Sequence, residues 1–323
     1  MGMSDARRTP RRFRAGPRDA DRLLRDFLAG RCPEVPLGFL NKLVRKGYVQ
    51  VDDRAAAPEL RMRRGMRVVL RLPEGAFYVA PNPDVPFEVV HEDDALAVIN
   101  KPAGVVTEPG IGHKLDTLLN GLMARYGHEL DRLGAAHDYG LVHRLDRETS
   151  GLLLVARTAA AQRNLVEQFR RRQVKKAYTA LLVGSPRDDK GTIRIPLGRT
   201  RRHGRMRAVV GGRGSRSAVT RYRVLERLQG CALIEGRPET GRWHQIRLHF
   251  AAEEMPVAGD GEHGDENANR LLRERYGLDR LFLHAGAIRV VHPLTKRLRA
   301  FEAPLPDALS RVLVAMRREG RSG

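Results

Sequence analysis

Cysteine is nearly absent from this chain. Only Cys32 and Cys231 occur among the 323 residues, and neither has a second cysteine nearby. The pattern therefore gives no sign of a disulfide framework or of a cysteine-based zinc centre. Aromatic residues are also scarce, at 5%, and Trp243 is the only tryptophan.

Long apolar runs are missing as well. No segment approaches the roughly 20 apolar residues that a membrane span requires. The early arginines are not followed by the apolar stretch of a signal peptide. We therefore expect a soluble, cytoplasmic protein that has no contact with a membrane.

Several well-known catalytic patterns are absent too. The chain has no G-x-x-x-x-G-K phosphate loop, no H-E-x-x-H zinc motif and no G-x-S-x-G elbow. One acidic, glycine-rich run, AGDGEHGDENANR, contains Asp260, Glu262 and His263. Its spacing does not match a calcium loop, so we expect a turn whose carboxylates cap nearby helices.

Acidic residues are few relative to basic ones. The sequence has 59 lysines and arginines against 38 acidic residues, which gives a formal net charge of +21 and an isoelectric point near 11.0. A polyanionic partner such as RNA accounts for this excess, because cations that neutralise phosphates release bound counterions. The plainer alternative is a general enrichment in arginine, with most of these side chains solvated.

The chain length and the 41% hydrophobic content are sufficient for one large domain and a small one. Residues 1–18 are rich in arginine and poor in apolar residues, so we expect a flexible basic tail. Residues 19–75 show two helical apolar patterns followed by short strand patterns, which predict a helix–helix–sheet domain. Lys42, Arg45 and Lys46 lie between the apolar positions of its second helix and form a basic ridge.

We expect a linker over residues 76–86 and a large domain over residues 87–318. Strand patterns such as LAVIN, LLLVA, KKAYTALLV and CALIEG outnumber the helical ones there, which fall near residues 115–126, 158–172, 243–252 and 306–317. Several strands follow one another directly. The fold class is therefore α+β, with a mixed, mainly antiparallel sheet. Residues 199–216 read as a mobile basic hairpin that can lie along a nucleic-acid backbone, or as a solvated loop.

The string LVHRLDRETSG, residues 141–151, precedes the apolar strand LLLVA. A loop anchored by a core strand can hold a reactive carboxylate rigidly. We expect Asp146 to be that carboxylate. Taken one at a time, such residues have ordinary explanations: a surface ion pair, a core tyrosine or an exposed arginine.

Together, HRLD and the following TSG resemble the signature of the RluA-type RNA pseudouridine synthases. INKPAG, KKAYTALLVG and TGRWHQIRLH match further family segments in the same order, from about Phe87 to Pro304. The resemblance implies a pseudouridine synthase fold that needs no metal and no cofactor. It implies Asp146 as the catalytic residue, Tyr178 as the active-site tyrosine, Arg247 as the basic partner and Arg144 as the residue that fills the gap left by a flipped base.

The front segment NKLVRKGYVQVDDR resembles the small RNA-binding domain named after a protein of the small ribosomal subunit. This resemblance makes candidate RNA contacts of Lys42, Arg45 and Lys46. His143, Thr149 and Arg242 are candidate substrate contacts, because they lie within the matching motifs. Trp243 departs from the usual small or polar residue of the family and could stack on a base or fill the core.

These roles are chemically coherent. Burial would raise the pKa of Asp146 above its usual value of about 3.9 unless a fixed cation opposes it. Arg247 is the candidate cation, since a guanidinium can bind a carboxylate through two hydrogen bonds. Tyr178 can stack on an extruded uracil or relay a proton, and base flipping costs a few kcal/mol that such contacts offset.

Three functions stay open from the sequence. The first is an isomerase that acts on RNA, with large-subunit ribosomal RNA favoured over transfer RNA. The second is a non-catalytic RNA-binding or ribosome-assembly protein, and the third is a glycosidic hydrolase that pairs Asp146 with Asp260. We expect a monomer.

Overall fold

The computed structural model describes residues 10–32, 37–71, 79–110, 112–202, 205–212 and 214–322. These residues divide into two compact units, one formed by Met1–Ala80 and Tyr126–Leu141 and the other by Pro81–Arg125 and Val142–Gly323. Helix α3 (Leu118–Leu133) crosses between the units at Tyr126, where the backbone leaves the helical region (φ −119°, ψ 23°). No helix within the described ranges is both long and apolar enough to cross a lipid bilayer.

The first unit packs two helices on a four-stranded antiparallel sheet of order β1-β4-β2-β3. Its elements are β1 (Arg11–Arg14), η2 (Pro17–Asp19), α1 (Leu24–Arg31), α2 (Leu37–Arg45), β2 (Val49–Val51), β3 (Arg54–Ala55), β4 (Arg67–Leu70) and η3 (Ala135–Gly140). Its core joins the apolar faces of the helices, such as Phe27 and Leu43, to Val49 and Val68 of the sheet. The predicted succession of helix, helix and sheet is therefore present.

The predicted flexible tail is wrong for part of its length. Arg11–Arg14 form strand β1, which pairs with all four residues of β4. Phe13 packs edge-on against Phe27 at 6.3 Å between ring centroids, so this short strand does contribute to a core. A four-residue edge strand with three arginines has almost no apolar pattern, so periodicity could not predict it. Residues 1–9 of the predicted tail lie outside the described residues.

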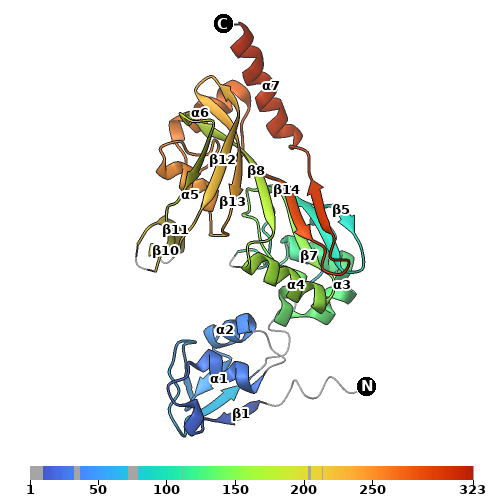
Figure 1. Cartoon of the computed structure of the whole chain (residues 1–323). Coiled ribbons are helices and arrows are strands. Elements are labelled where there is room, and N and C mark those ends of the chain that lie inside the picture. Colours follow the sequence, from blue (N-terminus) through green and yellow to red (C-terminus); the bar gives the residue numbers. More distant parts are fainter. Residues whose placement is uncertain are drawn as a thin grey trace. The chain divides into compact units, whose positions relative to one another are not determined.

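The second unit is built on a nine-stranded sheet (Figure 1). Its elements besides α3 are β5 (Glu88–Glu92), β6 (Leu96–Lys101), β7 (Ser150–Ala156), α4 (Ala159–Arg170), β8 (Lys175–Val183), β9 (Lys190–Ile193), β10 (Leu197–Arg202), β11 (Arg205–Val210), β12 (Thr220–Leu228), β13 (Cys231–Pro238), α5 (Gln245–Ala252), α6 (Glu266–Tyr276), β14 (Leu283–Val291), β15 (Leu298–Glu302) and α7 (Asp307–Ser322).

The strand order is β5-β6-β7-β14-β8-β13-β12-β9, with β15 paired to β14. Neighbouring strands run antiparallel except β7 and β14, which are parallel through His284 and Ala285. The predicted α+β class with a mixed, mainly antiparallel sheet is confirmed. Strands β10 and β11 form the predicted basic hairpin as a separate two-stranded ribbon.

Gly151 is required where β7 meets β14. Its φ of +115° is unfavourable for other residues, and a Cβ atom there would lie 2.4 Å from the carbonyl oxygen of Ala285. The glycine of the TSG motif thus lets two parallel strands approach directly after the loop that carries Asp146. The strand that follows, β7, is buried along its whole length.

Helices cover both faces of the large sheet. Helix α4 begins at its N-cap Thr158, whose hydroxyl accepts the Ala161 N–H, and packs Leu165 on the apolar residues of β7. Helices α6 and α7 pack on the opposite face, against Leu181 and Leu233. Helix α6 was not predicted, but Asp265 in the acidic run does cap it by accepting the Ala268 N–H. The predicted capping role of this run is confirmed at Asp265.

Candidate active site

The loop that carries Asp146 is fixed by the segment that follows β6. Thr107 donates its hydroxyl to the carbonyl of Leu145 (2.7 Å). Lys101, which is fully buried, donates through Nζ to the carbonyls of Pro102 (2.7 Å), Val105 (2.8 Å) and Arg147 (3.2 Å). The backbone is therefore held on both sides of Asp146. This explains how INKPAG and HRLD come to one site, because Lys101 binds the carbonyl of Arg147 although the two residues are 46 positions apart in the chain.

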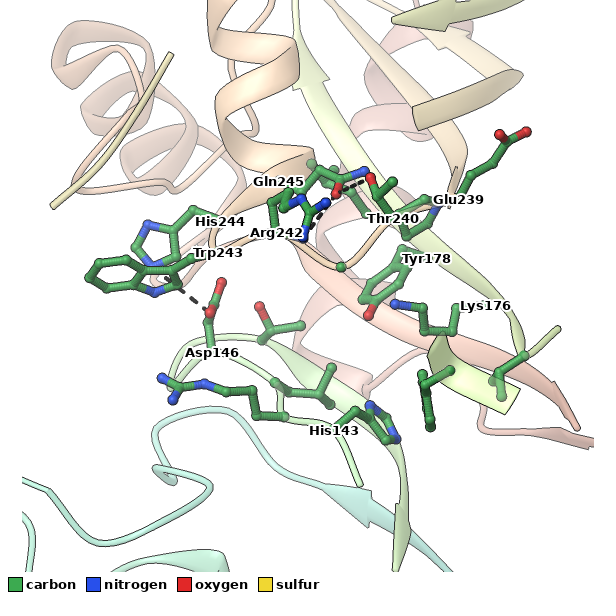
Figure 2. Close-up of a pocket in the computed structure, with 18 of the residues that line it drawn as sticks. His143, Asp146, Lys176, Tyr178, Glu239, Thr240, Arg242, Trp243, His244 and Gln245 are labelled. Carbon is green, nitrogen blue, oxygen red and sulfur yellow. Dashed lines mark hydrogen bonds and ion pairs between the residues drawn. The ribbon is translucent and has the colours of Figure 1, made fainter. Parts of the chain in front are cut away.

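Asp146 lies in a cavity of about 530 Å³, within the second unit. Its side chain is 21% exposed, and its oxygens lie 3.7 Å from Nη1 of Arg247 and 3.8 Å from Nε2 of His244. Figure 2 shows Asp146 between His244 on one side and Tyr178 on the other. The cavity also contains Arg144, so the residues predicted to act together do share one pocket.

Burial raises the pKa of Asp146 above its ordinary value of 3.8. The positive charges of Arg247, Arg144 and Lys101 oppose this effect without cancelling it, and Asp260 adds to it. Asp146 is thus a partly desolvated carboxylate whose anion is less stable than in water. Such groups are concentrated at functional sites.

Arg247 has a closer partner than Asp146. Its Nε and Nη2 donate to the two oxygens of Asp260 at 2.6 and 2.7 Å, and both side chains are almost fully buried. Asp260 also accepts the N–H groups of Glu262 and His263. The two hydrogen bonds anticipated between a guanidinium and the catalytic carboxylate are therefore made with Asp260, and Asp146 faces the remaining nitrogen.

These contacts also define the ionisation of Asp260. Burial alone would raise its pKa, but the hydrogen bonds and charge of Arg247 and the two backbone N–H groups lower it below 3.8. Asp260 is therefore a carboxylate at neutral pH and has no proton to donate. This argues against the hydrolase hypothesis, in which Asp260 would be the general acid.

Tyr178 and Lys176 enter the pocket from alternate positions of β8 (Figure 2). Burial raises the pKa of Tyr178 well above 10, and the charge of Asp146 raises it further, so the phenol keeps its proton. Burial lowers the pKa of Lys176 to about 8. Lys176 was not predicted as a site residue, although it lies in the KKAYTALLVG motif two positions before the tyrosine.

The loop between β13 and α5 forms the opposite wall. Gln245 joins its two sides, because Oε1 accepts from the Thr240 hydroxyl (2.7 Å) and the Arg242 N–H (3.0 Å), while Nε2 donates to the Val219 carbonyl (2.9 Å). His244, at the N-cap of α5, adopts the left-handed conformation (φ 54°, ψ 27°). This backbone geometry directs the imidazole toward Asp146.

The remaining predicted contacts line the same pocket. Thr149 is buried, and its hydroxyl has no hydrogen-bond partner within the described part of the chain. His143 stacks on Phe169 with ring centroids 4.7 Å apart, and its Nε2 accepts the Leu154 N–H. Burial lowers the pKa of His143 to about 3, so its ring is neutral.

Arg144, Arg242 and Trp243 lie at the rim. Arg144 is 61% exposed and donates to Glu108 at 2.7 Å. Arg242 donates through Nε to the Ser217 carbonyl. Trp243 packs on the small apolar cluster beneath the β10–β11 hairpin, and the guanidinium of Arg199 lies 5.4 Å from its ring centroid. One face of Trp243 therefore fills a core while the residue also borders the cavity.

Lys42 and Arg45 lie on α2 in the first unit, but Lys46 follows the last residue of the helix in a turn, so its predicted place on the second helix is wrong. The Lys42 amine is 3.6 Å from Asp138, and Arg45 is 3.9 Å from Glu59 with 70% of its side chain exposed. They form no part of the pocket of the second unit.

One group of side chains in the described part of the chain has the composition of a metal site. Ligand atoms of His244, Glu262 and His263 lie within 4.8 Å of one another. The Nη2 atom of Arg247 is 3.7 Å from the same Glu262 carboxylate, so a dication there would face a fixed positive charge. The two imidazoles instead share a hydrogen bond of 2.8 Å between Nδ1 of His244 and Nε2 of His263. Burial and the charge of Arg247 lower the pKa of both, which keeps them neutral.

Residues 95–252 match the family model described as RNA pseudouridylate synthase. An uncharacterised RNA pseudouridine synthase of Chloroflexus aurantiacus is 40% identical over 297 residues, which cover 89% of this chain and 87% of that protein. Ribosomal large subunit pseudouridine synthase D of Xanthomonas campestris pv. campestris is 37% identical, with 90% of this chain and 88% of that protein covered. The solved structure of human RNA pseudouridylate synthase domain containing 4 matches with a TM-score of 0.55 and 29% identity, covering 71% of this chain and 92% of that one.

Proposed function

The chain belongs to the RNA pseudouridylate synthase family and is an isomerase that acts on RNA, and we propose that Asp146 is its catalytic carboxylate and large-subunit ribosomal RNA its substrate. The observation that carries the first proposal is the position of Asp146. It is a desolvated carboxylate opposite a fixed guanidinium, in a pocket that also holds Tyr178.

The reaction breaks the glycosidic bond of a uridine, turns the base over and rejoins it through carbon. A carboxylate serves this chemistry either by adding to the sugar or the base, or by taking a proton from the ribose. Each role requires the anion. Burial raises the pKa of Asp146, which makes its anion a stronger base than a solvated aspartate, and the charges of Arg247, Arg144 and Lys101 oppose that rise and favour the anion.

Tyr178 and Thr149 are proposed to hold the extruded uracil. The Tyr178 ring offers an apolar face at the wall of the pocket, and its protonated hydroxyl can donate a hydrogen bond. The Thr149 hydroxyl is buried, borders the same cavity and has no partner among the described residues. A buried polar group of this kind gains most when a ligand supplies the missing hydrogen bond.

Arg144 is proposed to fill the gap that the flipped base leaves in the RNA. It is exposed at the rim and forms an ion pair with Glu108 at 2.7 Å. An exposed pair is worth little, so the arginine can exchange this partner for RNA at small cost. Arg242 and His143 complete the rim and floor of the same pocket and are proposed as further substrate contacts.

Large-subunit ribosomal RNA is favoured by the relatives. The Xanthomonas protein is named ribosomal large subunit pseudouridine synthase D, and this chain covers 88% of it. We also propose that the first unit holds the RNA through Lys42 and Arg45 of α2 and through Lys46, which directly follows this helix. Transfer RNA is the alternative, because residues 261–285 resemble a branch of the family that acts on it.

The test is pseudouridine mapping. Unmodified ribosomal and transfer RNA from a deletion strain are incubated separately with wild-type protein and with Asp146→Asn. We expect new pseudouridine at defined positions of large-subunit ribosomal RNA with the wild type and none with the variant. An active Asp146→Asn protein would overturn the assignment of the carboxylate, and modification of transfer RNA alone would overturn that of the substrate.

Mass spectrometry of the same reactions addresses the hydrolase alternative. Isomerisation leaves the mass of the RNA unchanged, whereas hydrolysis releases free uracil. We further propose that the protein acts as a cytoplasmic monomer and needs no cofactor. Sizing of the purified protein at working concentration, and activity after exhaustive dialysis against chelator, test the last two points.

A further inference from the structure

A second basic surface lies on the sheet face opposite the catalytic pocket. On β8, Lys176 and Tyr178 line the pocket, and side chains alternate along a strand, so Lys175 and Thr179 point to the other face. Thr179 pairs with Glu235 on β13. Residues directly opposite in an antiparallel pair share a face, so Glu235 and Arg237 also point away from the pocket.

The register extends this face across two more strands. Arg221 and Arg223 of β12 pair with Arg237 and Glu235 of β13. Lys190 of β9 pairs in turn with Arg223. We call the surface formed by Lys175, Lys190, Arg221, Arg223 and Arg237 the distal basic face.

The distal basic face is open to solvent. The side chains of Arg221 and Arg223 are each 61% exposed, and that of Arg237 is 62% exposed. Helices α6 and α7 cover the same sheet face at its other end, over Leu181 and Leu233. A hollow of about 420 Å³ lies between the exposed cations, and Thr192 and Gly191 form part of its lining.

Positive charge exceeds negative charge on this face. Glu235 lies 3.5 Å from Arg223 and 2.8 Å from Arg237, so one carboxylate serves two guanidinium groups. Arg221 pairs with Glu239. Five cations against these two carboxylates leave a net charge of +3 among the seven side chains. Exposed ion pairs contribute little to stability, so folding does not account for the excess.

The distal basic face is continuous with the catalytic pocket. Glu239 borders the pocket and also binds Arg221 of the distal face. In Figure 2 its carboxylate points away from Asp146, toward the outside of the cavity. Arg221 of the distal basic face is thus one ion pair away from the rim of the pocket.

We propose that the distal basic face binds the phosphate backbone of a second segment of the same RNA whose target uridine occupies the pocket. This inference rests on the proposed function and deepens it, since it assigns the enzyme a substrate too large to be held in the pocket alone. Small side chains between the cations allow a backbone to approach closely. A protein partner fits less well, because the centres of protein interfaces are depleted in charge. Phosphate contacts of this type position an RNA without reading its sequence.

The test compares two matched double variants of the full chain. Arg221→Gln with Arg223→Gln removes two arginines of the distal basic face. Arg275→Gln with Arg317→Gln removes two arginines of α6 and α7, 50% and 44% exposed, which pair with Glu319 and Glu226. Thermal melts confirm that each variant is folded. Affinity for a transcript of the large-subunit ribosomal RNA is then measured at several salt concentrations, together with kcat and KM.

We expect the distal variant to lower the slope of log Kd against log salt by about 1.5, since each lost phosphate contact accounts for about 0.7 to 0.9. Its KM for the transcript should rise several-fold with kcat unchanged. On a short hairpin that carries only the target uridine, the variant and the wild type should have the same kcat and KM. The control variant should match the wild type in every measurement. The inference would be overturned by an unchanged salt slope, by an equal change of slope in the control variant, or by an equal rise in KM on the hairpin. Failure of the proposed function would look different, because the wild type would then form no pseudouridine in either RNA.

Discussion

Replacing Asp260 by asparagine removes the main partner of the Arg247 guanidinium. Asp260 is 1% exposed and accepts two hydrogen bonds from Arg247 and two from backbone N–H groups. An asparagine keeps one carbonyl oxygen but turns an amide NH2 group toward donors. Breaking a buried ion pair from one side costs about 3 to 5 kcal/mol, because it leaves a buried charge uncompensated. Asp146 and Glu262 each remain 3.7 Å from the guanidinium, so we expect the lower limit, about 3 kcal/mol.

The assay is thermal unfolding followed by the fluorescence of Trp243, the only tryptophan, which lies beside the site. For a unit of this size, 1 kcal/mol corresponds to about 2 to 4 °C, so Asp260→Asn should lower Tm by roughly 6 to 12 °C at pH 7. Asp265→Asn is the matched control on the same loop, because asparagine caps a helix as well as aspartate does. If Asp260→Asn has the same Tm as this control and the wild type, the buried pair of Asp260 and Arg247 does not stabilise the fold as expected.

The same pair predicts a dependence on pH. The folded-state pKa of Asp260 lies below its ordinary value of 3.8. The unfolded chain therefore takes up the proton first, and the stabilisation is complete above pH 3.8 and is lost as the pH falls through the lower folded value. The difference in stability between wild type and Asp260→Asn should stay constant near neutral pH and shrink in acid. A gap that widens as the pH falls would contradict the assigned ionisation.

Four further outcomes are expected. Because the pKa of Asp146 is raised, kcat/KM for pseudouridine formation should fall as the pH drops through a value above 3.8, and a pH profile with its acid limb below that value would contradict this. Tyr178→Phe should keep KM within a few-fold, since the stacking ring remains, whereas Tyr178→Ala should lower the free energy of unfolding by about 3 kcal/mol in a urea titration. Gly151→Ala should cost about 2 kcal/mol or more in the same titration, because its φ is positive and the new Cβ meets the Ala285 backbone. Lys101→Met should lower kcat in steady-state assays and change KM little, because it releases the loop that carries Asp146 and leaves the pocket walls in place. An unchanged kcat would refute this.

The sequence predicted strands of the large sheet well because they leave strong local patterns. Strand β8 was predicted with its observed bounds, since KKAYTALLV is apolar and bounded by charged and glycine residues. The pocket contains Asp146, Tyr178 and Arg247, which were predicted from three separate motifs. Family resemblance supplied their joint role, because no single pattern in the chain indicates that these three side chains meet.

The partners of those residues could not be predicted in the same way. Asp260 lies 13 residues after Arg247 in a run of acidic residues, and nothing in its spacing distinguishes a buried partner from an exposed one. In the sequence, Lys101 cannot be distinguished from a solvent-exposed lysine. Its burial depends on three carbonyls that only the fold brings together. Helix α6 was missed because its N-cap, Asp265, follows a glycine-rich turn and its residues bury little.

The contacts of Arg247 are divided between Asp260 and Asp146, the proposed catalytic residue. A guanidinium has five N–H donors, and here Nε and Nη2 are fixed by Asp260 while Nη1 faces Asp146 at 3.7 Å, beyond hydrogen-bond distance. The charge therefore acts on Asp146 through space and does not occupy its lone pairs. Two direct hydrogen bonds would favour the anion more strongly, but they would lower its pKa and its basicity together. Anchoring the arginine on a second carboxylate thus lets its charge oppose the rise in the pKa of Asp146 while both oxygens of Asp146 stay free of hydrogen bonds from Arg247, as the proposed catalytic role requires.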